Sequence, residues 1–388
     1  MNVVPPNRGT TYFSGVRTQV TVRGIQDIME TWAPLDIAWE GDNAGLQTGD
    51  PDARVRGILV ALDVTEDIAS EAVRRGANLI VSHHPLLFRP LRSVTTRTAR
   101  ERCLAALLRK GLSVYSAHTN LDFTRGGTSF ALAKSLGVTP EGFLKSPFSL
   151  RSKIVTFVPR SHAGAVAAAM AAAGAGVIGE YDQCSFSGEG TGTFRGGPGA
   201  HPSIGRRGVT ERVTEVRLEM AAPRRSVAEV VRALKKAHPY EEVAYDIYPL
   251  ANADAEYGMG AIGTLSRPLP IGAFIPLVRR VLKSPSVRWS GNPRTTVRRV
   301  ALCGGSGSDL LPEAIASGAD VFVTADVRYH TYQEAEERIV LVDAGHFETE
   351  YPVVAAIVER LRRETLRRGS RIRVRAAATS TNPVRGSM

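Results

Sequence analysis

Histidines and carboxylates recur in this chain at a spacing that suits metal binding. His118 is followed four residues later by Asp122, and His346 is followed four residues later by Glu350. Each pair comes shortly after a short apolar run. Imidazole and carboxylate groups bind zinc, iron and manganese alike, so the repeated pattern predicts a divalent-metal site without deciding which metal it holds.

Two adjacent histidines, His83 and His84, strengthen this prediction. They follow an apolar run and precede Pro85, which favours an extended backbone at His84. Because adjacent side chains on an extended chain point apart, both rings reach one site only if the chain turns there or if they bind two neighbouring metals. Five ligands are many for one catalytic ion, but they suit two ions that share a carboxylate. The predicted metal ligands are His83, His84, Asp122, His346 and Glu350.

Three further residues are candidates for other roles at the same site. His118 and His330 are candidate general acid–base catalysts, because imidazole exchanges protons near neutral pH. A sixth-ligand role for His118 stays open. Asp326 occupies the position in the second repeat that His84 occupies in the first, and we assign it to substrate binding. For His118, His330 and Asp326, a purely structural polar role is an equal alternative.

A glycine-rich stretch follows one of the apolar runs of the second repeat. Gly304, Gly305 and Ser306 lie between an expected strand and an expected helix, where backbone N–H groups can cradle an anion. The stretch lacks the lysine of a phosphate-binding P-loop and the full spacing of a dinucleotide-binding motif. Beside a metal site, it predicts a substrate that carries phosphate.

The candidate residues lie on two similar segments, residues 55–122 and 297–350. Both open on an apolar run, continue into a helical pattern and deliver histidine and carboxylate at the end of a later run. Alternating strands and helices predict a mostly parallel sheet with ligands at the carboxyl ends of its strands. We therefore expect an α/β core that is duplicated and pseudo-symmetric.

A segment of different character separates the two repeats. Its pattern reads strand, helix, strand, strand, helix, strand, which is typical of a small ferredoxin-like α+β domain. The predicted organisation is a split core with this domain inserted. The expected bounds are 21–148 for the first half of the core, 152–250 for the insert and 257–388 for the second half.

Composition limits the compartment and the partners. The chain has 388 residues, and its three cysteines lie far apart with no C-x-x-C pair, which favours a reducing compartment over a disulfide framework. Neither a leader pattern nor an apolar stretch of about 20 residues is found, so we expect a cytoplasmic protein without a membrane segment. The net charge of +11 has two explanations, nucleic-acid binding or a solvated arginine-rich helix. No aromatic residues interleave with the C-terminal arginines, which favours the second explanation.

Together these motifs resemble the Nif-three-like family, whose members are often labelled GTP cyclohydrolase 1 type 2 homologs. The resemblance implies an α/β core that binds two divalent metals through the five ligands above and assembles into a ring-like homohexamer. It also implies an insert similar to the PII and CutA fold. The motifs that carry it are Asp42-Asn43-Ala44-Gly45-Leu46-Gln47, Ser82-His83-His84-Pro85-Leu86, Ser116-Ala117-His118-Thr119-Asn120-Leu121-Asp122, Cys303-Gly304-Gly305-Ser306-Gly307, Asp343-Ala344-Gly345-His346 through Glu350, and Thr381-Asn382-Pro383.

Two functions follow as expectations. The first is a metal-dependent hydrolase that acts on a nucleotide-like or phosphorylated small molecule, which the family label would make GTP. The second is a metal-binding regulatory or scaffold ring protein that binds nucleic acid or a protein partner. This sequence departs from the family pattern at Trp39, whose spacing to Asp42 is altered, and at Ala325, where the family usually has glycine. Neither departure touches the five predicted ligands.

Overall fold

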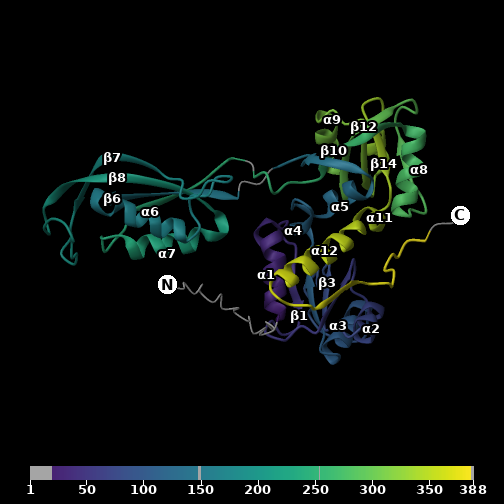
Figure 1. Cartoon of the computed structure of the whole chain (residues 1–388), viewed down its shortest axis with the longest axis horizontal. Coiled ribbons are helices and arrows are strands. Elements are labelled where there is room, and N and C mark those ends of the chain that lie inside the picture. The colour runs from purple at the N-terminus through teal and green to yellow at the C-terminus, as the bar shows by residue number, and fades with distance from the viewer. Residues whose placement is uncertain (1–19, 147–149, 253, 386–388) are drawn as a thin grey trace, which may run out of the picture. The chain divides into compact units, whose positions relative to one another are not determined.

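The computed structural model describes residues 20–146, 150–252 and 254–385. They form two compact units, one made of the residues up to 145 together with those from 259 onward, the other made of residues 146–258 (Figure 1). The second unit is therefore continuous in sequence and interrupts the first. The N-terminal residues that bear on a leader segment lie outside the described residues.

The first half of the core is built on a five-stranded sheet in the order β1-β4-β3-β2-β15. Strands β4, β3, β2 and β15 are parallel neighbours, and β1 pairs with β4 in the antiparallel direction. All residues of β2, β3 and β4 are buried, as expected for parallel strands covered on both faces. The strands are β1 (Gly45–Thr48), β2 (Gly57–Ala61), β3 (Leu79–Ser82), β4 (Ser113–Ser116) and β15 (Arg373–Ala376).

Helices from both ends of the chain cover this sheet. One face packs on α2 and α3, and the other on α1 and the C-terminal helix α12. Each of α1, α2 and α3 begins after a threonine whose hydroxyl accepts a backbone N–H of the first turn. The helices are α1 (Val22–Trp32), α2 (Glu66–Arg74), α3 (Ala99–Arg109) and α12 (Pro352–Arg367).

The second half of the core is built on a six-stranded sheet in the order β11-β14-β13-β12-β10-β5. Strands β14, β13 and β12 are parallel, and the other pairings are antiparallel. Helices α5 and α8 pack on one face, and α9 and α10 on the other. The elements are β5 (Val138–Gly142), β10 (Ala261–Pro270), β11 (Arg288–Ser290), β12 (Thr296–Ser306), β13 (Val321–Ala325), β14 (Val340–Asp343), α5 (Thr128–Ser135), α8 (Ile271–Leu282), α9 (Leu311–Ala316) and α10 (Tyr329–Ala335).

The two sheets share one plan. In each, three parallel strands follow one another in sequence order, and an antiparallel strand pairs with the last of them: β1 beside β4 and β11 beside β14. A short helix follows the third parallel strand of each set and carries site residues. These helices are α4 (Thr119–Asp122) and α11 (His346–Glu350). The prediction of a duplicated α/β core is confirmed.

The second unit is a four-stranded antiparallel sheet in the order β7-β8-β6-β9. Its element order is β-α-β-β-α-β, and both helices pack on the same face of the sheet (Figure 1). Its likeness to PII and CutA stays a prediction. The elements are β6 (Arg151–Pro159), α6 (Ala163–Ala172), β7 (Phe186–Arg195), β8 (Thr210–Pro223), α7 (Val227–Ala237) and β9 (Tyr245–Pro249). Short 3₁₀ helices cover Arg160–His162 and Arg224–Ser226 in this unit, and Leu35–Ile37 and Ser308–Leu310 in the core.

Two expectations from composition can be compared with the described residues. Cys103, Cys184 and Cys303 are all free thiols. Within residues 20–146, 150–252 and 254–385, no helix combines the length and the apolar character that a membrane crossing needs.

Candidate metal centre

The first half of the core supplies its candidate residues from two neighbouring strand ends. His83 and His84 directly follow β3, and His118 precedes α4, which ends at Asp122. Because β3 and β4 are adjacent and parallel, their carboxyl ends meet at one edge of the sheet. The ring of His118 accordingly lies 5.4 Å from the ring of His83 and 5.6 Å from the ring of His84, between centroids.

The second half of the core supplies a histidine and a carboxylate from one short helix. His346 is the first residue of α11 and Glu350 the last, so the two side chains lie on the same helix face. Their contact is direct, with Nε2 of His346 3.2 Å from Oε2 of Glu350. Glu350 is almost fully buried, whereas His346 is partly exposed.

Glu350 contacts candidate ligands from both halves of the core. Its Oε2 atom lies 2.9 Å from Nε2 of His84, and its Oε1 atom lies 3.8 Å from Nε2 of His83. Asp122 approaches the same ring, with Oδ1 3.5 Å from Nε2 of His83. The ligand atoms of His83, His84 and Glu350 lie within 4.8 Å of one another, an arrangement that can hold a metal ion.

The outer nitrogens of two rings are held by carboxylates. Nδ1 of His84 lies 2.7 Å from Oδ1 of Asp63, and Nδ1 of His346 lies 2.7 Å from Oδ2 of Asp326. Histidines that bind metals almost always donate their other ring N–H to such a partner, which fixes the ring orientation and leaves Nε2 for the metal. These two carboxylates therefore prepare the rings for metal binding.

Three buried polar atoms at the centre contact one another or neighbouring rings without a hydrogen bond of good geometry. Nδ1 of His83 donates to the carbonyl oxygen of Ala117 at 2.8 Å, but its buried Nε2 atom makes no such bond among the described residues. The same holds for the buried Oδ1 of Asp122 and Oε2 of Glu350, although ring nitrogens lie 3.5 Å and 2.9 Å from them. Buried polar atoms without partners are costly. A divalent cation would satisfy these three atoms, so the donor set fits a metal.

The charges of the site also favour the binding of a cation. Burial alone would raise the pKa of Glu350, but contacts with His346, His83 and His84 hold it well below its ordinary value. Burial opposes protonation of His84, yet its contacts with Asp63 and Glu350 raise its pKa to about 10. The contact with Glu350 raises the pKa of His346 to about 9. Without metal the rings therefore keep protons at neutral pH, which a cation would replace.

His118 is held beside the cluster by Asp42. Nδ1 of His118 lies 2.8 Å from Oδ1 of Asp42, and the other carboxylate oxygen accepts hydrogen bonds from Thr119. Burial would raise the pKa of Asp42, but these bonds from His118 and Thr119 lower it to about 2. Asp42 is thus a fixed anion that orients the His118 ring.

Sequence reasoning did not identify the roles of Asp42 and Asp63. Asp42 was noted only within a family motif, and it lies 76 residues from its partner His118. Asp63 follows strand β2 closely, so its place after an apolar run was an available signal. The spacing pattern indicates candidate metal ligands, but it does not indicate the carboxylates that orient those ligands.

His330 and Asp326 differ in their relation to the cluster. His330 is exposed on α10, where Nδ1 contacts Oε1 of Gln333 at 3.0 Å and the ring lies 5.5 Å from that of Tyr329. These contacts do not involve the cluster, and the catalytic role of His330 stays a prediction. Asp326 has a left-handed backbone with φ of 54° and contacts His346. It therefore holds the ring of a candidate ligand, and its role in substrate binding stays a prediction.

The glycine-rich stretch lies inside β12 and does not form a free loop. The amide of Gly305 donates to Oγ1 of Thr349 at 3.0 Å, and the amide of Gly304 donates to Oγ of Ser129 at 3.4 Å. A Cβ atom at Gly305 would overlap with Oε1 of Glu350. The amides of Gly304 and Gly305 thus have partners within the protein, and substrate binding by this stretch stays a prediction. At Gly305 the absence of a side chain lets Glu350 approach. Ser306 pairs with Ala325 of β13.

These features define a class of protein: a mixed α/β fold with a histidine–carboxylate cluster able to hold a metal ion. The chain belongs to the Duf34/NIF3 (NGG1p interacting factor 3) family, whose model matches residues 20–383. The family resemblance seen in the motifs is therefore confirmed.

Named relatives and solved structures agree with this assignment. The chain is 41% identical over 325 residues to the "GTP cyclohydrolase 1 type 2 homolog" of Halalkalibacterium halodurans, covering 83% of this chain and 87% of that protein. It is 38% identical over 370 residues to the Mycobacterium tuberculosis protein of the same name, covering 94% and 96%. A Bacillus cereus protein related to NIF3 superposes with a TM-score of 0.79 at 37% identity, covering 95% of this chain and 99% of that one.

Proposed function

We propose that this protein is a hydrolase that depends on two divalent metal ions and acts on a nucleotide-like or phosphorylated small molecule. One observation carries the proposal: Nε2 atoms from both halves of the core, those of His84 and His346, approach the same buried carboxylate of Glu350. A carboxylate shared in this way suits two ions bound side by side. The proposed ligands are His83, His84, Asp122, His346 and Glu350, and their nitrogen and oxygen donors fit zinc, iron or manganese.

The residues around the ions have separate tasks. When bound, such ions lower the pKa of a water molecule and polarise the oxygen of a substrate. Asp63 and Asp326 keep two rings oriented, as their contacts with His84 and His346 indicate. His118 is the proposed proton carrier: Asp42 occupies its Nδ1 atom, so Nε2 takes up or releases the proton.

A cavity beside the cluster supports a small-molecule substrate. It has a volume of about 640 Å³, within the range of about 300–1,000 Å³ that is typical of ligand pockets. Asp63, His84, Arg100 and Cys103 are among its lining residues. The name "GTP cyclohydrolase 1 type 2 homolog", borne by the relatives, supports GTP as the first nucleotide to test.

The proposal extends to the assembled state. The family resemblance supports a ring-like homohexamer in the cytoplasm, and analytical ultracentrifugation of the purified chain would test the hexamer. A sedimentation coefficient that corresponds to a monomer at working concentrations would contradict it.

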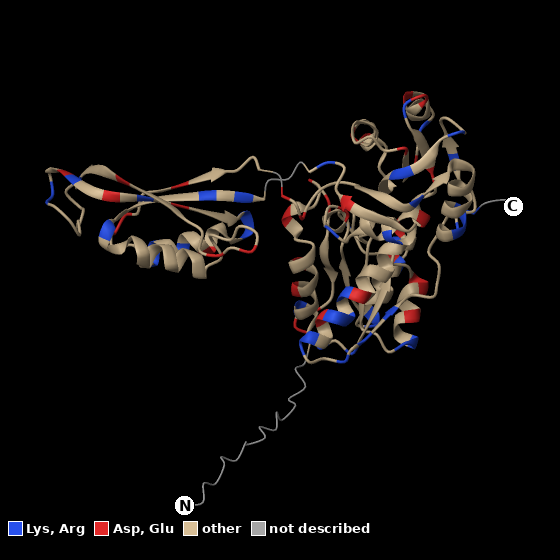
Figure 2. Cartoon of the chain, turned by 45° about the horizontal axis from the view of Figure 1, so that its top comes forward, with Lys and Arg blue, Asp and Glu red and all other residues tan. Residues whose placement is uncertain are grey.

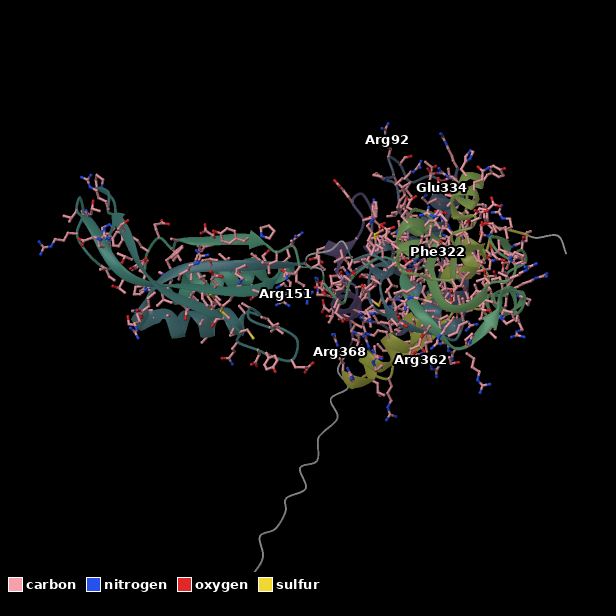
Figure 3. The ribbon with its side chains drawn as sticks, turned by 90° about the horizontal axis from the view of Figure 1, so that it is seen from above. Arg92, Arg151, Phe322, Glu334, Arg362 and Arg368 are labelled. Carbon is pink, nitrogen blue, oxygen red and sulfur yellow. The ribbon has the colours of Figure 1, made fainter. Side chains whose placement is uncertain are left out.

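The alternative, a nucleic-acid-binding protein without catalysis, receives less support from the basic C-terminal helix. Arg362 donates to the carbonyl oxygen of Val374, and Arg368 to that of Gly24. Figure 3 labels both arginines. Glu364 contacts three more arginines, namely Arg360, Arg363 and Arg367. Basic and acidic residues also alternate along the ribbon of the core (Figure 2). Salt-sensitive DNA binding that is lost with Arg371→Ala and Arg373→Ala would favour the alternative.

The decisive experiment combines metal content with turnover. Elemental analysis of the native protein should give about two ions per chain, falling in the variants His83→Ala and Glu350→Ala. His162→Ala, which changes a histidine of the other unit, is the matched control and should keep its metal. Metal-loaded protein is then assayed with GTP, other nucleoside triphosphates and simple phosphate esters. A native protein that neither retains nor rebinds metal would overturn the proposal, and metal without turnover of any of these would favour the binding protein.

A further inference from the structure

The unit of residues 146–258 contains a pocket that the metal chemistry does not use. It has a volume of about 720 Å³ and is lined by residues of this unit only. Strand β7, the loop after it and the segment before β9 form its walls. Both helices of the unit pack on one face of the sheet (Figure 1). The lining residues Gly188, Gly190 and Glu215 belong to the other face, so the pocket lies on the helix-free side.

The floor of the pocket is a strip of bare backbone. Gly188, Gly190 and Gly192 alternate along β7, so all three belong to one face of the strand. A Cβ atom at Gly188 or Gly190 would meet nothing within 4 Å, and neither residue has a positive φ. The backbone geometry therefore does not require glycine at these two positions. Their effect is to leave a flat, open surface.

One acidic side chain faces this floor. Gly190 pairs with Glu215 of β8, and a Cβ atom at Gly192 would overlap with the carboxylate of Glu215. The neighbouring residues Val216 and Leu218 belong to the core under the helices, which fixes the side of the sheet on which Glu215 lies. Glu215 is only 8% exposed although no helix covers this face. Other parts of the unit must therefore enclose it.

A tethered loop provides that enclosure. The amide of His201 donates to Oε1 of Glu241 at 2.6 Å, and the hydroxyl of Ser203 donates to the carbonyl oxygen of Pro239 at 2.8 Å. Both bonds join the loop after β7 to the segment before β9. The pocket is thus a built cavity with a roof as well as a floor.

The other charged groups near the pocket already have partners. Arg217 contacts Glu219 at 2.7 Å, and Glu189 contacts Arg160 at 2.7 Å. No lysine or arginine is found paired with Glu215 among the described residues, and the side chain of Tyr240 interacts with it. A buried carboxylate without a cation is costly unless N–H or O–H donors reach it.

The nearest polar groups do not supply that cation. His238 accepts the Tyr240 amide at Nδ1 and donates from Nε2 to the carbonyl oxygen of Phe157, so its ring is neutral. Burial also lowers the pKa of His238. The buried Tyr240 hydroxyl makes no hydrogen bond of good geometry within the described residues, but it lies beside Glu215, and burial together with that carboxylate raises the pKa of Tyr240 to about 12. The carboxylate and the hydroxyl therefore face each other beside the pocket, and the carboxylate keeps further acceptor sites for N–H donors.

We propose that this pocket binds a flat nitrogen heteroaromatic molecule that presents adjacent N–H donors to Glu215. The bare glycine strip and the aromatic rings of Phe157, Phe194 and Tyr240, which line the pocket, fit a planar ring. A ring N–H next to an exocyclic amino group matches the two oxygens of a carboxylate, and the tyrosine hydroxyl adds one more contact. This site is independent of the metal centre.

The test uses the full chain and four probes: guanosine, neopterin, adenosine and spermidine. Guanosine and neopterin carry the required pair of N–H donors, whereas adenosine lacks the ring N–H. Isothermal titration should show binding of guanosine or neopterin and at least about 10-fold weaker binding of adenosine. Glu215→Gln should weaken binding about 10- to 100-fold, because a charged hydrogen-bond acceptor is lost. Tyr240→Phe should weaken it about 2- to 10-fold.

A filled pocket gives the sharpest variant. Gly190→Val places a side chain in the open space above the strip, so it should abolish binding, while valine suits a strand and should not lower the melting temperature. Ser187→Val on the opposite face of β7 is the matched control and should bind as the native chain does. No binding of guanosine and neopterin, equal binding of adenosine, or unchanged binding by a folded Gly190→Val variant would each overturn the proposal. So would binding of spermidine alone, which needs only the charge.

Discussion

The two halves of the core share one strand plan but carry different chemistry at equivalent strand ends. Strand β3 ends at the pair His83 and His84, whereas β13 ends near Asp326. The first half thus provides rings at this position, and the second half provides a carboxylate that holds a ring elsewhere, on His346. The carboxylate on which the rings converge, Glu350, comes from the second half.

This difference shows how a duplicated scaffold can form one site. The repeat places polar residues at matching strand ends, but after β3 and β13 the sequence has diverged, giving the candidate ligands His83 and His84 in one half and the supporting carboxylate Asp326 in the other. Because Glu350 contacts rings from both halves, the halves depend on each other at this point. Four changes test that dependence.

Removing the shared carboxylate should have the largest effect. Glu350→Gln keeps the size of the side chain but removes the charge that His83, His84 and His346 face. Metal affinity should fall by more than the about 10- to 100-fold expected when only an outer hydrogen-bond partner of a ligand is lost. Titration with zinc or manganese against a chelator measures this. An affinity within about 3-fold of the native value would show that Glu350 is not a ligand.

Placing a side chain against the same carboxylate should have the second-largest effect. Gly305→Ala introduces a Cβ atom that overlaps with Oε1 of Glu350, at a residue with φ of +65°. We expect unfolding free energy to fall by about 1–3 kcal/mol and metal content to fall with it. Gly318→Ala is the matched control, since Gly318 has φ of +69° but open space around it. Equal losses in both variants would mean that only backbone strain matters.

Replacing the supporting carboxylate of each half in turn compares how much each one contributes to metal affinity. Asp63→Asn should weaken metal binding about 10- to 100-fold, since Asp63 also accepts a hydrogen bond from Thr381 and its side chain is 32% exposed. Asp326→Asn should cost less, because Asp326 is 51% exposed and its charge is better screened by water. Asparagine tolerates the left-handed backbone of Asp326. The reverse order of affinities would indicate that the second half dominates ring orientation.

The smallest effect should be the pH dependence of the metal-free protein. The pKa values of His84 and His346, about 10 and about 9, lie above the ordinary 6.5. Protonated rings therefore favour the folded state below about pH 6.5, and this stabilisation should be lost as the pH rises towards 9 and 10. Thermal unfolding from pH 6 to 10 should show a falling melting temperature for chelator-treated protein. Metal-loaded protein should change less, since metal affinity rises as protons leave. Melting temperatures that fall equally with pH in the metal-free and the metal-loaded protein would contradict this prediction.

Much of the outline followed from local sequence. Continuous apolar runs at β2, β3 and β4 predict buried parallel strands, because a strand covered on both faces needs apolar residues throughout. The repeated spacing of histidine and carboxylate placed His118, Asp122, His346 and Glu350 near strand ends, and the adjacent pair His83 and His84 completed the candidate set. These features depend on a few consecutive residues, so the chain itself displays them.

Other features depend on which distant segments meet. Asp42 lies beside His118 although 76 residues separate them, and Arg373–Ala376 joins the first sheet as β15 although it belongs to the second half of the chain. The need for glycine at Gly305 became evident only with Glu350 against it. The amino-acid sequence determined the elements and the residue types available at their ends. Only the tertiary structure decided which carboxylate holds which ring, because that choice depends on how two sheets and their covering helices pack.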